Sequence, residues 1–225
     1  MTSTNKTVLY IGGHGKIGLL STPKLVSAGY AVRSLVRKEE YFDELRKLGA
    51  EPVLGDITSL TQADWQKLFD GVDVVVWGAG NGGRGGAELT TAVDRDGALT
   101  VIDALEALAA SDRAVPKLVM ISYIGATQNS PSLEGNSWDA YVSAKKTVDA
   151  RLSISSLDYL ILGPSALTEE PAGGVKVVPD EASGAKDTHT SRELVADVIT
   201  EVVSRDSFPE SPLAFIDGSD SVSSI

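Results

Sequence analysis

The feature that most constrains this chain is a glycine-rich turn near its beginning, Gly12-Gly13-His14-Gly15-Lys16-Ile17-Gly18. A short apolar run, Thr7–Ile11, comes before the turn, and a segment with apolar residues at helical spacing follows it. Strand, tight turn and helix in this order are typical of the first unit of a parallel sheet. The turn therefore predicts an α/β fold from the first twenty residues.

The rest of the chain continues this alternation of strand-like and helix-like segments. It predicts an α/β, doubly wound, mainly parallel Rossmann sheet with helices on both faces, since each parallel connection is long enough to hold a helix. Further strands are expected at residues 31–36, 51–54, 72–77, 117–122, 159–162, 175–178 and 213–216, and helices at 39–48, 62–69, 138–155 and 192–204, with one long helix over 88–110.

Length and composition set the domain organisation. With 225 residues and no break in composition, the chain is expected to form a single domain over residues 1–225, in which residues from about 163 form a small extension on the substrate side. The chain has no cysteine and only two histidines, His14 and His189, so a thiolate or metal centre is disfavoured and no metal ligand is predicted.

Charge narrows the range of partners. A net charge of −11 repels phosphate backbones and anionic lipids, so neither nucleic acid nor a membrane is an expected partner. The beginning of the chain lacks an apolar signal region, and we expect a cytoplasmic protein with a small-molecule substrate. Homo-oligomers are common on this fold, so self-association is also an expectation by analogy.

The glycine-rich turn suits the pyrophosphate of a dinucleotide. Glycines keep side chains away from the pyrophosphate, and the N-terminus of the following helix points at the negative charge. All seven residues, Gly12, Gly13, His14, Gly15, Lys16, Ile17 and Gly18, are therefore candidate cofactor-binding residues.

The end of the second expected strand bears on the choice of dinucleotide. Proteins that prefer NAD place an acidic residue there, whereas this chain has Arg37 and Lys38. A guanidinium can hold the 2′-phosphate of NADP by paired charged hydrogen bonds. We expect NADP(H) to be favoured over NAD(H), although both residues also fit a solvated helix start.

Two other strand ends belong to the same edge of the sheet. Asp56 and Ile57 follow the third strand, where an adenine would lie, although Asp56 also fits a cap of the next helix. Gly78, Ala79 and Gly80 follow the fourth strand, at the carboxyl edge where ligands of this fold bind.

These segments together resemble the atypical short-chain dehydrogenase/reductases, including the NAD(P)H-binding proteins similar to biliverdin reductase B and the NmrA-like proteins. The similarity covers nearly the whole chain. It includes the glycine-rich turn, residues 32–37, 55–57, 71–75 and 119–122, a Tyr-x-x-x-Lys segment, and residues 157–164, on which ground Pro164 is expected near the cofactor.

The resemblance also implies a catalytic group. Tyr141 and Lys145 are one helical turn apart and share a helix face, and Ser122 stands at the end of the preceding strand. By resemblance, Ser122 polarises a substrate carbonyl, Tyr141 is the general acid/base, and Lys145 holds the nicotinamide ribose and lowers the pKa of the tyrosine. The spacing alone also fits an ordinary helix with a surface lysine.

The resulting hypothesis is an NADP(H)-dependent oxidoreductase that transfers hydride between nicotinamide and a small carbonyl, quinone or similar acceptor. Two alternatives stay open from the sequence. One is a regulatory protein that senses NADP(H) without catalysis. The other is an isomerase or dehydratase that uses bound cofactor without net oxidation or reduction.

Overall fold

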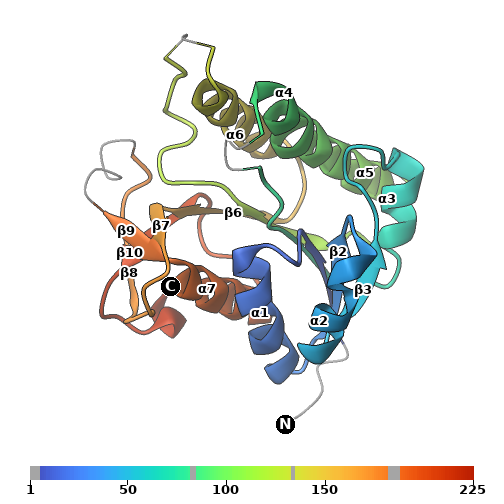
Figure 1. Ribbon diagram of the computed structural model, residues 1–225, viewed down its shortest axis with the longest axis horizontal. Helices are drawn as coiled ribbons and strands as arrows, with labels where there is room; N and C mark the ends of the chain where they lie inside the picture. The colour runs from blue at the N-terminus through green and yellow to red at the C-terminus, as the bar shows by residue number, and fades with distance from the viewer. Residues whose placement is uncertain (1–5, 82–84, 133–134, 182–187) are drawn as a thin grey trace.

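The protein is built around one eight-stranded sheet with helices on both of its faces (Figure 1). The computed structural model describes residues 6–81, 85–132, 135–181 and 188–225. The strand order is β3-β2-β1-β4-β5-β6-β10-β8, and every pairing in it is parallel except the last, in which β8 runs antiparallel to β10. The predicted doubly wound Rossmann sheet is confirmed.

The strands are short and in a regular register, and the central ones are buried. Val8 and Ile11 of β1 lie beside Val74 and Trp77 of β4, so these two central strands end together. The strands of the sheet are β1 (Thr7–Ile11), β2 (Ala31–Val36), β3 (Glu51–Leu54), β4 (Val74–Trp77), β5 (Lys117–Ile121), β6 (Tyr159–Pro164), β8 (Val175–Val177) and β10 (Leu213–Asp217), and β7 (Ala166–Thr168) pairs with β9 (His189–Ser191) in a separate small sheet.

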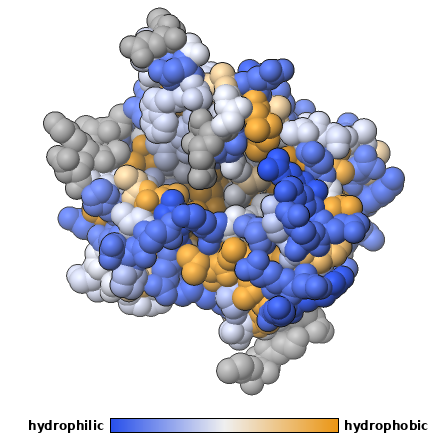
Figure 2. All heavy atoms as spheres, viewed as in Figure 1, coloured by the Kyte–Doolittle hydropathy of each residue, from blue (hydrophilic) through white to orange (hydrophobic). Residues whose placement is uncertain are grey.

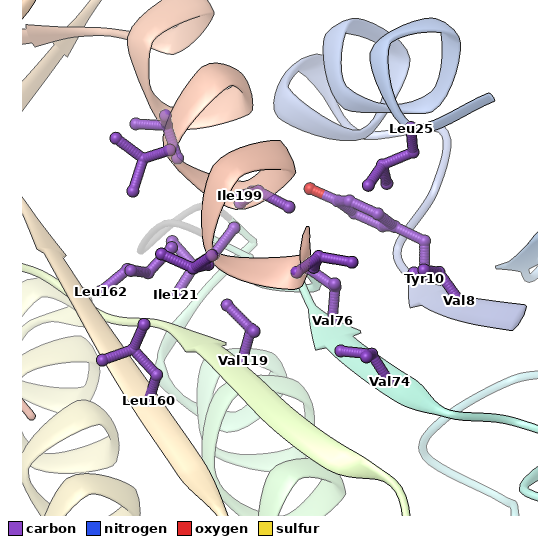
Figure 3. Close-up of a cluster of buried hydrophobic side chains, with 14 of the residues drawn as sticks. Val8, Tyr10, Leu25, Val74, Val76, Val119, Ile121, Leu160, Leu162 and Ile199 are labelled. Atoms are coloured by element: carbon purple, nitrogen blue, oxygen red, sulfur yellow. The ribbon is translucent and has the colours of Figure 1, made fainter. Parts of the chain in front are cut away.

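Alternating residues of each strand divide the core into two clusters. Val8 and Tyr10 face one side, where Leu25 and Ile199 pack on them from α1 and α7 (Figure 3). Leu9 and its alternating partners face the other side, against α3, α5 and α6. Burial on both faces explains why the strands are continuously apolar, as parallel strands usually are.

The helices lie in two layers over these clusters (Figure 1). Thr61 begins α3 with a capping box, and Asn136 and Ser191 cap α6 and α7 through their side chains. The helices are α1 (Lys16–Ser27), α2 (Phe42–Lys47), α3 (Gln62–Leu68), α4 (Ala87–Thr90), α5 (Ala98–Ala110), α6 (Ser137–Ser153) and α7 (Arg192–Ser204), with short turns of 3₁₀-helix at Glu39–Tyr41 and Val222–Ser224.

The long helix expected over residues 88–110 is interrupted. Between α4 and α5 the chain forms a π-helical segment, η2 (Thr91–Gly97). An added Cβ at Gly97 would lie 3.4 Å from the Trp77 ring, so this part of the chain lies close to the end of β4. A π-helical turn holds an extra residue and changes which side chains face the sheet.

Residues after 163 mostly continue the main sheet. Strand β10 pairs with β6 and β8 pairs with β10, while α7 packs against α1 on one face. Only the small sheet of β7 and β9 and the segments beside it lie outside the main sheet in the described part of this region.

Candidate functional site

A cleft of about 310 Å³ lies at the carboxyl edge of the sheet, among the loops that follow β1, β2, β3 and β4. The sheet order reverses here, because β2 lies on one side of β1 and β4 on the other. The residues expected at the cofactor that line this cleft are Gly12, His14, Gly15, Arg37, Asp56, Ile57, Gly78, Ala79 and Gly80.

The glycines of the turn have different structural roles. Gly12 has φ +83°, and an added Cβ would lie 2.8 Å from the Ala79 backbone, so the loops after β1 and β4 touch there. An added Cβ at Gly18 would lie 2.5 Å from the Gly13 carbonyl oxygen. These positions need glycine for the fold itself.

Gly15 is the position at which the turn leaves room for a ligand. An added Cβ there would meet the carbonyl oxygens of Gly12 at 3.1 Å and Gly78 at 4.0 Å, and no other described atom within 4 Å outside its chain neighbours. Gly15 is also the N-cap of α1 and brings no side chain to its backbone donors. This cradle at a helix N-terminus fits a dinucleotide pyrophosphate.

Six residues expected at the cofactor do not line the cleft: Gly13, Lys16, Ile17, Gly18, Lys38 and Pro164. The Lys16 ammonium pairs instead with Glu169 at 2.6 Å, and that of Lys38 pairs with Glu40 at 2.9 Å. Ile17 packs against the core, and the carbonyl of Pro164 accepts a hydrogen bond from the backbone of Ile124. The two ammonium groups and the Ile17 side chain are therefore directed away from the cleft.

Arg37 and Asp56 stand together at one end of the cleft. Arg37 is exposed and makes no hydrogen bond or ion pair with any described residue. Asp56 accepts hydrogen bonds from the backbone and hydroxyl of Thr58, and these, with the charge of Arg37, hold the pKa of its carboxyl below the usual value. Asp56 thus fixes the turn after β3, whereas Thr61 caps the next helix.

An aromatic pair that the sequence did not indicate lines the cleft beside Arg37. The rings of His14 and Tyr41 are stacked, with centroids 3.7 Å apart and an interplanar angle of 8°. The imidazole Nε2 of His14 also lies 2.9 Å from a carboxylate oxygen of Glu44. Tyr41 and Glu44 lie 27 and 30 positions after His14, so the spacing along the chain does not reveal these contacts.

The three expected catalytic residues lie in a second cluster, beyond the cleft. Ser122 is buried after β5, and its hydroxyl donates to Oδ2 of Asp149 over 2.6 Å. The ammonium of Lys145 donates to the carbonyl oxygen of Ile121 over 2.9 Å, next to Ser122 in the chain. The structure brings Ser122 and Lys145 together through these neighbours.

Tyr141 belongs to the same cluster through its ring. Its centroid lies 5.6 Å from that of Tyr123 and 5.3 Å from that of Trp138, so the three rings form one cluster. The Lys145 ammonium lies 5.9 Å from the Tyr141 centroid. No hydrogen bond joins its phenol to Ser122 within the described chain.

The expectation that Lys145 lowers the pKa of Tyr141 is wrong for this structure. Burial raises the pKa of the phenol, and the carboxylates of Asp94 and Asp149 raise it further. The Lys145 ammonium faces the Tyr141 ring. Oδ1 of Asp94 lies 4.0 Å from the ammonium, so the positive charge of Lys145 is partly offset.

Asp94 connects the cluster to the cleft. It lies in the π-helical segment and is almost fully buried. Its Oδ2 accepts a hydrogen bond from the backbone of Asn81, which lines the cleft, and its Oδ1 lies 4.0 Å from the Lys145 ammonium. The predicted cofactor site and the predicted catalytic group are therefore neighbours.

Sequence reasoning missed both buried carboxylates. Asp149 had a signal, because it lies four residues after Lys145 and eight after Tyr141 and so shares their helix face. Asp94 had no comparable signal, because Arg95 and Asp96 follow it and the three together are typical of a solvated stretch. Their burial, and hence their chemistry, depends on tertiary packing.

The described part of the chain shows neither a metal-ligand cluster nor a membrane-spanning helix. Across residues 6–81, 85–132, 135–181 and 188–225, no three acidic or histidine side chains come together as metal ligands. No helix in those ranges is long and apolar enough to cross a bilayer, and hydrophilic side chains cover most of the face in Figure 2.

Comparisons with known proteins agree with a dinucleotide-binding α/β fold. A family model described as NAD(P)H-binding matches residues 12–206. An uncharacterized sugar epimerase, YhfK of Bacillus subtilis, is 31% identical over 204 residues, which are 85% of each chain. A candidate NAD-dependent epimerase/dehydratase from Bacillus halodurans superposes with a TM-score of 0.82 at 28% identity over 97% of both chains. The Lactococcus lactis oxidoreductase ylbE shares the fold, with a TM-score of 0.76 at 24% identity over 97% of this chain and 94% of that one.

Proposed function

This chain belongs to the NAD(P)H-binding family, and on that premise we propose that it is an NADP(H)-dependent oxidoreductase acting on a small carbonyl, quinone or similar acceptor. The observation that carries the proposal is the position of Asp94. It hydrogen-bonds the loop that lines the cleft and lies 4.0 Å from Lys145, so a dinucleotide in the cleft would extend toward the cluster. Pocket and proton-transfer groups are then adjacent.

The chain's own groups would bind the cofactor at three places. Gly15 and the N-terminus of α1 would hold the pyrophosphate, the exposed guanidinium of Arg37 would hold a 2′-phosphate, and Lys145 would donate to the ribose. An ammonium has three donors, of which one is used by the Ile121 carbonyl. Bound NADPH would supply the hydride.

Tyr141 is proposed as the proton donor to the oxygen that becomes negative as hydride arrives. Its raised pKa keeps the phenol protonated at neutral pH, which is the form that reduction requires. The same shift also makes the phenol a weaker acid, so the ease of proton release depends on the charges of the neighbouring carboxyl groups.

The test is NADPH oxidation measured against a panel of carbonyl and quinone acceptors, with wild type and Tyr141→Phe compared on each. Tyr141→Phe should retain NADPH affinity and lower turnover by about 10² to 10⁴, as loss of a general acid does. Tyr123→Phe is the matched control, since it removes a phenol from the same aromatic stack. Equal turnover in Tyr141→Phe and wild type would contradict the role of Tyr141.

A non-catalytic NADP(H) sensor is a second candidate, and one observation favours it. Ser122 donates to Asp149 and Lys145 to the Ile121 carbonyl, so neither bonds to the Tyr141 phenol. A sensor would bind NADPH, but it would not oxidise NADPH with any acceptor of the panel. The names of the relatives also favour an isomerase or dehydratase, which would convert substrate while NADP(H) absorbance stays constant.

A further inference from the structure

Ser122 donates its hydroxyl hydrogen to Asp149, whereas the expected role of Ser122 requires this hydrogen at the substrate carbonyl. Their oxygens are 2.6 Å apart, and both residues are almost fully buried. The backbone N–H of Ser122 donates to the Leu162 carbonyl, which fixes the serine at the end of β5. The serine backbone is therefore held beside Asp149, and the direction of the hydroxyl hydrogen is free to change.

A serine hydroxyl has one hydrogen, so the protonation state of Asp149 decides its direction. An ionised carboxylate only accepts, and Ser122 must then give it that hydrogen. A protonated carboxyl can donate to the serine oxygen, and the serine hydrogen becomes available to another acceptor. Polarising a substrate carbonyl requires the second arrangement.

We propose that Asp149 is a positioning residue whose protonated form turns the Ser122 hydroxyl toward the substrate oxygen, and whose ionised form withholds it. The inference rests on the proposed reductase function. It assigns a role to a carboxyl that lies two helical turns from Tyr141, on the face of α6 that carries Lys145.

The surroundings of Asp149 favour the protonated form. Its second oxygen, Oδ1, is buried without a hydrogen-bond partner among the described residues. Burial raises the pKa of this carboxyl to about 6, although the Ser122 hydroxyl and the Lys145 ammonium act against the shift. Protonation thus changes within the physiological pH range.

Charged and titratable groups face Asp149 from each element packed around it. Lys145 lies on the same helix as Asp149 and also lies near Asp94 of the π-helical segment. The positive charge of the ammonium therefore acts on both carboxyl groups. Asp180, from the segment after β8, raises the pKa of Asp149 further. The phenols of Tyr123 and Tyr141 complete the set, and the charge of Asp149 raises the pKa of each.

The first experiment is the pH profile of kcat/KM for acceptor reduction in wild type and Asp149→Asn. Wild-type activity should fall by about tenfold for each pH unit above a midpoint near 6. The amide of Asp149→Asn can donate to Ser122 at every pH, so its profile should be flat across this range. A descending limb that persists in Asp149→Asn would overturn the proposal while leaving the reductase function intact.

The second experiment needs no turnover and covers the case in which Asp149→Asn does not fold. Carbon-13 NMR of the aspartate carboxyls, followed against pH without cofactor, reports the titration of Asp149. Ser122→Ala removes a donor to the ionised form and should move the midpoint upward. An unchanged midpoint would overturn the proposal. A shifted midpoint without activity on any acceptor would refute the reductase function but retain the link between the two residues.

Discussion

Replacing Asp149 with asparagine is expected to change how the stability of the fold depends on pH. The carboxyl has a pKa of about 6 in the folded protein against 3.8 for an ordinary aspartate. Between these values the folded chain holds a proton that the unfolded chain has released, so stability falls as pH rises through this window. A difference of about two pKa units corresponds to roughly 3 kcal/mol. The ionised carboxyl lowers the free energy of unfolding by this amount at neutral pH.

Urea denaturation at about pH 4, near the lower end of this window, and at about pH 7.5, above it, measures this difference. The free energy of unfolding of Asp149→Asn, relative to wild type, should rise by roughly 2 to 3 kcal/mol from the acidic to the neutral condition. Asp70→Asn is the control, because it removes an exposed carboxyl on the surface. A relative stability that stays constant between the two conditions would refute the burial argument for Asp149.

Two further predictions concern the cofactor. Arg37→Ala should weaken NADPH binding by about tenfold to a hundredfold and leave NADH binding nearly unchanged, in fluorescence titrations that use exposed Arg113→Ala as control. An unchanged affinity ratio would show that Arg37 does not read the 2′-phosphate. Gly15→Val should abolish binding of both dinucleotides with a native circular dichroism spectrum, since φ −68° suits any residue and the added methyls fill the cradle. Intact binding in this variant would remove the argument for the cradle.

The sequence predicted the central sheet well because its signals are local. The central strands β1, β4, β5 and β6 are mostly apolar runs, and Arg192–Ser204 has helical periodicity and a capping serine before it. The carboxyl edge of a parallel sheet then follows from strand direction alone. For this reason the glycine turn, Arg37 and Ala79 could be expected at one cleft before their contacts were known.

The remaining features depend on contacts between distant segments. Strands Ala166–Thr168 and His189–Ser191 have three residues each, too few to show a period of two, and they exist because they pair with each other. The π-helical segment Thr91–Gly97 keeps an ordinary helical pattern of residues. Its extra residue reflects packing rather than local preference.

The same reasoning explains why the cluster of Ser122, Tyr141 and Lys145 was easier to predict than its hydrogen bonds. Helical spacing brings Tyr141 and Lys145 to one face, and strand order brings Ser122 near them. The direction of a hydroxyl or ammonium depends on the strongest acceptor within reach, and here these are the Asp149 carboxyl and a backbone carbonyl.

Asp149 links the two groups proposed to act on the substrate oxygen. When it is ionised, Ser122 donates to it, and its negative charge also raises the pKa of the Tyr141 phenol. When it is protonated, the serine hydrogen is released and that part of the electrostatic effect on the phenol disappears, which makes Tyr141 a stronger acid. Lys145 and Asp94 then remain as one pair of opposite charges in the cluster. A single proton on Asp149 therefore favours reduction through both residues, and this is why the descending limb should vanish in Asp149→Asn rather than merely shift.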